Sequence, residues 1–304
     1  MHMKNVLVVY YSQSGQLKEV SQRIALPFDQ STDVHVQYLE IKPKKVYPFP
    51  WPKEAFFDVF PESFRQVPVD IEEPSPEILN TKFDLVLLFY QVWYLSPSIP
   101  VTSFLKSDYA KKILHNTNVV TISGSRNMWV MAQEKVKILL KSHSADLVGN
   151  IALVDRHINL VSVITIVDWM FTGLKRKVYG ILPLPGISDE EINESIKFGK
   201  IIVSHLRNGE LGSLQRELVT NKAVEIRHFL VSMDKKANRM FKIWSGIIAN
   251  KQGQARKKWL IGFNYYLFFA IWFLSPLVHL IHTILLPITY FKIKREKAYF
   301  QGVE

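Results

Sequence analysis

The clearest chemical signal lies near the N-terminus, where an apolar run breaks into hydroxyls and a glycine. The residues after this run are, in order, Ser12, Gln13, Ser14, Gly15, Gln16 and Leu17, and a helical pattern begins at Gln16. Backbone N–H groups at a helix N-terminus, together with two hydroxyls, suit a phosphate dianion. The turn has no lysine, and the chain contains neither G-x-x-x-x-G-K-[ST] nor G-x-G-x-x-G, which excludes the usual nucleoside triphosphate loop. The plain alternative is a strand-to-helix turn in which a serine caps the helix.

Two more polar loops follow apolar runs of strand length. The first loop begins with Gln91, Val92, Trp93 and Tyr94. The second contains Ser123, Gly124, Ser125, Arg126 and Asn127. Open α/β sheets bind ligands at the carboxyl ends of their strands. The sequence therefore predicts one ligand site shared by all three loops.

A candidate for proton transfer follows the fifth apolar run. His157 is the best candidate at neutral pH because its ordinary pKa lies there, and Tyr94 and Asp168 are weaker ones. A structural role is the alternative for a single histidine. The apolar segment 158–173 that follows is interpreted as a lid or substrate channel, or as a helix that extends the core. His279 and His282 share a helix face, but without a third ligand we predict no metal site.

Composition excludes several kinds of chemistry. The 304 residues include no cysteine, which rules out disulfides, thiolate nucleophiles and iron–sulfur clusters. The net charge is +11, and after Asn208 there are fifteen Lys and Arg against six Asp and Glu, so +9 of the total lies in the last third. Because the longest apolar run lies there too, we expect a lipid surface as partner and no nucleic acid.

Five short β-rich runs alternate with helical patterns and must position these loops. The runs are Val6–Tyr11, Val34–Ile41, Leu85–Tyr90, Val119–Ser123 and Ile151–Val154. The helical patterns cover Gln16–Leu26, Ile99–Lys106 and Trp129–Ser142. Strands separated by helices imply right-handed crossovers. We predict an α/β fold with a five-stranded parallel sheet and helices on both faces.

The predicted domain ends near residue 208. A Pro-rich connection over 42–76 is expected to contain one short helix near Lys53–Phe60. Ser188 followed by Glu191 predicts a capping box and a helix to about His205. Residues 209–250 have a basic amphipathic helical pattern, in which Met240 and Ile243 are expected on the apolar side with Leu214 and Leu218.

Residues 251–304 contain an almost uncharged stretch, Trp259–Phe291, which Ser275-Pro276 divides into two halves. Each half is short for a membrane crossing, and positive residues flank both ends. We therefore predict a re-entrant or in-plane hydrophobic helical hairpin, with a kinked single span and a buried dimer core as alternatives. The N-terminus has no leader pattern, so the expected location is the cytoplasmic face of the inner (cytoplasmic) membrane.

The three loops resemble those of the flavodoxin and flavin-reductase superfamily. There the first loop, of the form S-x-[ST]-G-x, wraps the FMN phosphate, and the other two border the isoalloxazine ring. The resemblance implies a flavodoxin-like fold and FMN as cofactor. Arg126 is expected either to place a positive charge near the flavin and stabilise its reduced form, or to pair with an acidic residue at the rim of the site. Gln16-Leu17 and Arg126-Asn127 depart from the residues that relatives often carry there.

A narrower resemblance is to the flavoproteins of bacterial dialkylresorcinol biosynthesis, described as condensing or aromatising enzymes. It depends on residues 125–129 and 131–134, the apolar insertion and the hydrophobic tail. It implies oxidation of a dialkylcyclohexanedione to a dialkylresorcinol, with a ketosynthase of the same pathway as a partner. The alternatives are a membrane-associated NAD(P)H:quinone or flavin reductase and a flavodoxin-like electron carrier. A homodimer is compatible with each.

Overall fold

The computed structural model describes residues 3–304, and its centre is one parallel sheet. The five parallel strands are β1 (Lys4–Tyr10), β2 (Val34–Glu40), β3 (Leu85–Trp93), β5 (Asn118–Ser125) and β6 (Asp146–Val154). They run in the order β2-β1-β3-β5-β6, and a short β4 (Ser96–Pro97) pairs antiparallel with β3. The predicted α/β class and the five strands are confirmed. This order, with β1 between β2 and β3, is flavodoxin-like.

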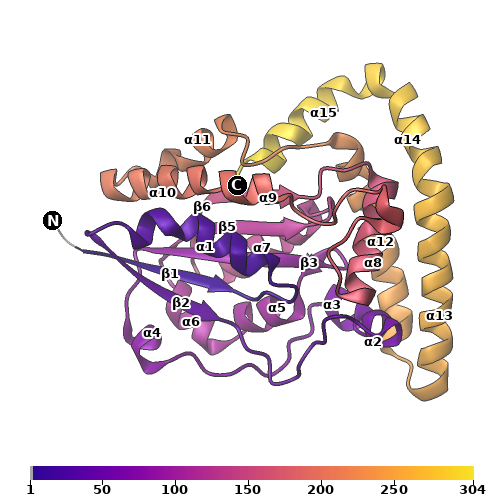
Figure 1. The fold of residues 1–304 in the computed structure, drawn as a ribbon, viewed down its shortest axis with the longest axis horizontal. Coiled ribbons are helices and arrows are strands. Elements are labelled where there is room, and N and C mark those ends of the chain that lie inside the picture. The colour runs from indigo at the N-terminus through magenta and orange to yellow at the C-terminus, as the bar shows by residue number, and fades with distance from the viewer. Residues whose placement is uncertain (1–2) are drawn as a thin grey trace.

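Helices cover both faces of the sheet (Figure 1). One face packs against α1 (Gln16–Asp29), α9 (Asp189–Glu194), α10 (Ile196–Asn208) and α11 (Leu214–Thr220). The other packs against α4 (Pro76–Asn80), α5 (Ile99–Leu105), α6 (Asp108–Leu114) and α7 (Val130–Ser142). Alternate residues of each strand enter opposite cores because strand side chains alternate between the two faces.

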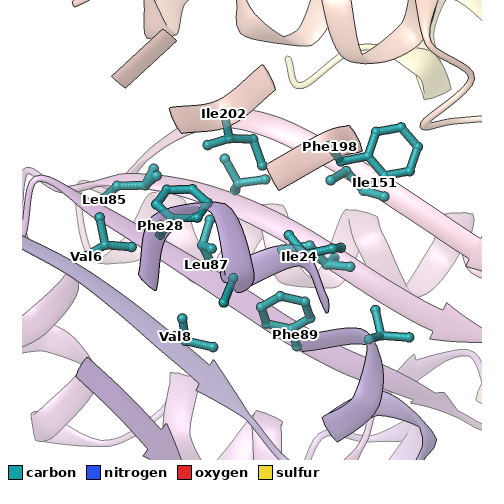
Figure 2. Packing of buried hydrophobic residues seen from close by; sticks show 14 of the residues in the cluster. Val6, Val8, Ile24, Phe28, Leu85, Leu87, Phe89, Ile151, Phe198 and Ile202 are labelled. Carbon is teal, nitrogen blue, oxygen red and sulfur yellow. The ribbon is translucent and has the colours of Figure 1, made fainter. Parts of the chain in front are cut away.

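Figure 2 shows the first of these cores, where Val6, Leu85 and Ile151 of the sheet meet Phe28 and Ile202 of the helices. Helices α1 and α10 approach closely at Gly199, where a Cβ would lie 2.1 Å from the carbonyl oxygen of Ile24. Glycine is therefore required for this contact. The contact fixes α1, and with it the loop that precedes α1, on the sheet.

The Pro-rich connection is more helical than predicted. It contains α2 (Lys53–Asp58) and α3 (Phe60–Phe64), followed by α4, instead of one short helix. Pro61 and Pro76 lie in the first turns of α3 and α4, where a missing N–H costs nothing. Prolines at these two positions therefore begin helices.

The helix start at Ser188 is confirmed, since its hydroxyl accepts a hydrogen bond from the Glu191 N–H at 3.1 Å. The reciprocal half of the capping box is absent among residues 3–304, because the Glu191 carboxylate instead binds Arg156 at 2.8 Å. The helix also breaks at Ser195, which divides it into α9 and α10.

Between β6 and α9 the chain forms α8 (Asn159–Thr172), which ends at Gly173 in the left-handed conformation, and a short 3-10 turn η1 (Val178–Gly180). Ser162, Thr165 and Trp169 form the buried side of α8. Many of its apolar side chains are only half-buried. Figure 1 shows α8 beyond the carboxyl ends of the strands.

After α10 the chain forms η2 (Leu211–Ser213), α11 and α12 (His228–Ala249). The expected apolar side is correct for Leu214 and Leu218 but wrong for Met240 and Ile243, which are exposed. The buried face of α12 instead contains Val231, Asp234, Phe241, Ser245 and Ile248. The irregular stretch 221–227 separates α11 from α12. The apolar face predicted for one helix over both segments therefore does not continue from α11 into α12.

The C-terminal region consists of α13 (Gly253–Phe269), a π-helical segment η3 (Ala270–Leu274), α14 (Ser275–Ile284) and α15 (Leu286–Gln301). The turn expected at Ser275-Pro276 does not occur, because Gly253–Ile284 forms one continuous helix and the chain bends at Leu285. The wider π turn just before Pro276 accommodates the proline ring and the missing N–H.

Candidate functional site

The loop between β1 and α1 forms an open cradle. Gly15 caps α1 with φ of +90°, and apart from its own chain neighbours no heavy atom of residues 3–304 lies within 4 Å of the position that a Cβ would take. The Ser12 hydroxyl accepts from the Lys18 N–H at 3.1 Å, and the first helical bond runs from Glu19 N–H to the Gly15 carbonyl. The N–H groups of the first residues of α1 therefore have no acceptor within the helix, and such a group of donors suits an anion.

The side chains of Gln16 and Leu17 serve the fold. The Gln16 amide donates to the Ile187 carbonyl at 2.9 Å and accepts from the Ile187 N–H at 3.0 Å. Leu17 is buried and packs against Gly124, whose Cβ would lie 3.1 Å from the Leu17 side chain. Both side chains are therefore used within the protein. The predicted contacts of these residues with a cofactor are left to their backbone atoms.

The loop after β3 carries an aromatic cluster. The Trp93 ring lies edge-to-face against Tyr47 at 5.2 Å, Trp51 at 5.5 Å and Tyr11 at 6.1 Å. Val92 packs against the core, and the Gln91 Nε2 atom is buried without a hydrogen-bond partner in the described chain. The loop therefore offers aromatic surface and one unsatisfied amide donor at the edge of the sheet.

Tyr94 does not suit the catalytic role considered for it. Its hydroxyl donates to the Phe56 carbonyl at 2.7 Å, and its ring packs against Phe56 and Phe60, both with centroids 5.1 Å away. Burial raises the pKa of Tyr94 well above its usual value. Tyr94 and Leu95 both have positive φ, of 48° and 60°, a conformation uncommon for residues other than glycine. The hydroxyl proton of Tyr94 is therefore held in a hydrogen bond to a backbone carbonyl.

The segment at the end of β5 contains three buried polar atoms without a hydrogen-bond partner among residues 3–304, Ser123 Oγ, Ser125 Oγ and Asn127 Oδ1. Ser123 is fully buried inside the sheet, with its hydroxyl near that of Tyr90. The side chains of Leu17 and Ile187 fill the space beside Gly124. Because Ser123 lies inside the sheet beside Tyr90, Ser125 and Asn127 are the better placed of the three to offer hydrogen bonds to a ligand.

Arg126 binds the start of α8. Its guanidinium donates to the Asn159 side-chain oxygen at 2.7 Å and to the Asn159 carbonyl at 3.2 Å, and Asn127 donates to the same side-chain oxygen at 2.8 Å. Burial lowers the pKa of Arg126 to about 10 while nearby Asp155 opposes the shift. The group therefore stays charged at neutral pH and joins the third loop to α8.

His157 lies outside these contacts, with an exposed side chain. Asp155 beside it is fully buried and accepts from the Ser162 hydroxyl at 2.7 Å and from the His157 N–H at 3.0 Å. This carboxylate organises the first turn of α8. The role of His157 in proton transfer stays a prediction.

Helix α8 is attached at both ends, with Asn159 bound to the third loop at its start. At its C-terminal end the Trp51 N–H donates to the Met170 carbonyl at 2.8 Å, and Trp169 lies edge-to-face on Phe49 at 6.0 Å. A Cβ on Gly186 would lie 2.6 Å from Gln16 Oε1, so the segment before α9 closes tightly on the first loop. Sequence reasoning missed these contacts, because they join residues far apart in the chain.

The two histidines considered for a metal pack against aromatic rings instead. The His279 ring lies edge-on to Phe229 at 4.4 Å, and His282 stacks on His228 at 5.2 Å. Within residues 3–304 no group of three metal-ligating side chains occurs.

Solved structures with similar folds are flavoproteins and flavodoxins at low identity. A flavoprotein from Lactobacillus acidophilus NCFM, solved with FMN, is 19% identical over 49% of this chain and 92% of its own, with a TM-score of 0.37. Flavodoxin 1 from Bacillus cereus is 14% identical over 66% of this chain and 99% of its own, also at 0.37. No protein-family model and no curated protein matches the chain. At these identities and TM-scores the similarities assign no function, and it is the strand order that describes a flavodoxin-like fold.

Proposed function

We propose that FMN binds at the carboxyl edge of the sheet, with its phosphate at the N-terminus of α1. The open cradle at Gly15 carries this proposal, because the positive φ and the free space beside it suit close approach of a phosphate. The unsatisfied atoms Gln91 Nε2, Ser125 Oγ and Asn127 Oδ1 supply donors and an acceptor for the polar edge of the ring. The residues present therefore fit the group.

FMN supplies hydride transfer when it is bound. The protein contributes positioning and exclusion of water. The aromatic rings around Trp93 provide an apolar wall, and α8, held by Arg126 and by the Trp51 N–H, covers the edge of the sheet. These features favour a ring-shaped, lipophilic substrate over a small polar one.

Within that class, we propose oxidation of a dialkylcyclohexanedione to a dialkylresorcinol. The support is the sequence resemblance of the third loop, together with the apolar surroundings of the site. Aromatisation removes a hydride and a proton from the substrate ring. His157 is the candidate that accepts the proton.

A spectrum of the purified chain tests cofactor binding first. Bound FMN gives absorption bands near roughly 370 and 450 nm, and its phosphate-free analogue riboflavin should bind more weakly if the cradle holds the phosphate. Equal affinity for both would contradict the phosphate assignment.

Anaerobic stopped-flow experiments then separate the reactions. If a cyclohexanedione bleaches the flavin band near roughly 450 nm, the result supports the proposed oxidation of this substrate. Bleaching by NAD(P)H followed by quinone turnover would favour the reductase alternative. Bleaching only by a protein donor would favour an electron carrier.

A further inference from the structure

The helix formed by α13, η3 and α14 presents a long apolar surface to the outside of the molecule. The helix has 32 residues. Its most apolar stretch of 18 residues has a mean hydropathy of 1.8, and only 6% of that stretch is buried. The outward face contains Ile261, Tyr265, Phe268, Phe273, Leu277, Leu280 and Ile284. Exposed apolar patches of this extent mark interaction sites.

The π-helical segment keeps this face continuous. Exposed residues follow each other at steps of three or four along the helix; before Phe273, the exposed Phe269 lies four residues away and Phe268 lies one step of five away. That step contains Ala270–Leu274, where the hydrogen bonds have π-helical spacing. A π turn takes up one extra residue, so the apolar face is not rotated toward the protein. The same turn leaves Ser275 buried on the inner side.

Both ends of the helix are attached to the folded domain. Near its start, Phe263 is fully buried and stacks on Phe60 with centroids 3.7 Å apart. After its end, α15 returns toward the sheet, and Phe300 is buried in the same cluster as Trp129. The Gln215 amide donates to the Gln301 carbonyl at 2.6 Å. Figure 1 shows α13 and α14 along one side of the molecule and α15 leading back to the C-terminus.

This attachment excludes a crossing with the two flanks on opposite sides of a bilayer. The helix is also about 48 Å long at 1.5 Å per residue, which exceeds the roughly 30 Å of a hydrocarbon layer. An in-plane position satisfies both facts, since the outward face then contacts lipid while the inner face stays on α12.

The charges around the helix indicate which lipid it meets. Exposed lysines lie beside its start at Lys257 and Lys258, and Lys292 and Lys294 follow its end. Amphipathic helices with basic flanks bind anionic headgroups. Trp259 and Tyr290, near the two ends, are 40% and 58% exposed, as residues at a lipid interface often are.

We propose that the α13–α14 helix docks in the plane of an anionic bilayer, with the folded domain and both flanks on the same side. The site fits a phospholipid surface with acidic headgroups. It is independent of whether the sheet edge binds FMN.

Flotation with preformed vesicles tests the proposal on the full chain. We expect the protein to float with an equal mixture of phosphatidylcholine and phosphatidylglycerol, and more weakly with phosphatidylcholine alone. Lys257→Gln with Lys258→Gln should lower binding to the anionic vesicles about tenfold. Failure to float with either composition would overturn the proposal, and so would a stable dimer in lipid-free buffer that buries this face.

A matched pair of triple variants locates the lipid face. Phe268→Gln, Phe273→Gln and Leu280→Gln together should lower vesicle binding about a hundredfold. The control replaces Val46, Val67 and Ile138 by Gln, which are 80%, 43% and 69% exposed and lie elsewhere on the surface. It should float like the unaltered chain. Equal loss in both variants would contradict the assignment of the face.

The absence of cysteine makes the topology directly measurable. Single variants Gln252→Cys and Glu304→Cys place a thiol on each side of the helix. With protein added to sealed vesicles, a membrane-impermeant maleimide should label both thiols. Labelling of Glu304→Cys only after the vesicles are lysed would show a spanning helix and overturn the in-plane geometry.

Discussion

Gly15 and Gly209 share a positive φ and open space where a Cβ would lie, but only Gly15 faces the candidate phosphate site. Gly15→Val and Gly209→Val should both cost about 1–3 kcal/mol of backbone strain. Only Gly15→Val should also weaken FMN binding, by at least about a hundredfold, because its side chain fills the cradle. Fluorescence titration with FMN measures this, and similar affinity in the two variants would contradict the assignment.

Asp234 is a buried carboxyl that connects α12 to α7. Its Oδ2 atom accepts from the Met131 N–H at 3.3 Å in the first turn of α7, while Oδ1 has no partner among residues 3–304. Burial raises the pKa of Asp234 to about 7, against weaker opposing effects from these backbone donors and from Lys135. Lys135 is itself largely buried, which lowers its pKa to about 8.

The raised pKa of Asp234 predicts a pH-dependent stability. Because the folded chain holds this proton more tightly than the unfolded chain, the stabilisation is complete below about pH 4 and is lost as the pH rises through about 7. Asp234→Asn lacks this titration. The variant should therefore gain stability relative to the unaltered chain between these pH values, by up to roughly 4 kcal/mol. Urea unfolding of both proteins at several pH values checks this, and a constant difference would contradict it.

At the scale of elements, α13 is held by an aromatic cluster that also contains Tyr94. Phe263 packs on Phe60, and Phe60 contacts Tyr94 at the end of β3. Phe263→Ala should cost about 3–5 kcal/mol, since a fully buried ring leaves a cavity. Phe268→Ala on the exposed side of the same helix should change stability by less than about 0.5 kcal/mol in lipid-free buffer. The midpoint of urea unfolding compares them, and equal effects would mean that α13 does not pack as described.

At the scale of the whole molecule, the C-terminal region is attached to the sheet at two points. Removal of all residues after Asn250 keeps the sheet and its three loops but uncovers the partners of Phe263 and Phe300. We expect a chain that still binds FMN when folded but has a markedly lower unfolding midpoint. Calorimetry with and without FMN measures this, and an unchanged midpoint would show that these contacts contribute little.

Activity toward lipid substrates is better tested with surface variants than with truncation. Two alkyl chains each contribute about 0.8 kcal/mol per buried CH₂, so a long-chain substrate stays almost entirely in lipid. If the proposed reaction and docking both hold, the triple Gln variant of Phe268, Phe273 and Leu280 should lose turnover of vesicle-bound substrate about tenfold or more. It should keep its turnover of a short, water-soluble analogue. Equal losses on both substrates would contradict delivery from the membrane.

The sequence by itself determined the sheet, the first loop and the apolar character of the tail. Strands such as Leu85–Trp93 are continuous apolar runs because both faces are buried, and Gly15 stands out because it breaks a strand into a helix. Such features depend on neighbours within a few residues. They were therefore predictable from local pattern alone.

Tertiary structure alone decided which polar side chains are available and how the tail is placed. Gln16 hydrogen-bonds to Ile187, Arg126 to Asn159, and Tyr94 to Phe56. Each partner lies at least 33 residues away in the chain. The bend at Leu285 and the burial of Phe300 likewise depend on contacts with distant helices. Hydrogen bonds and packing between remote segments leave no periodic signal in the sequence, because each depends on where the fold brings two surfaces together.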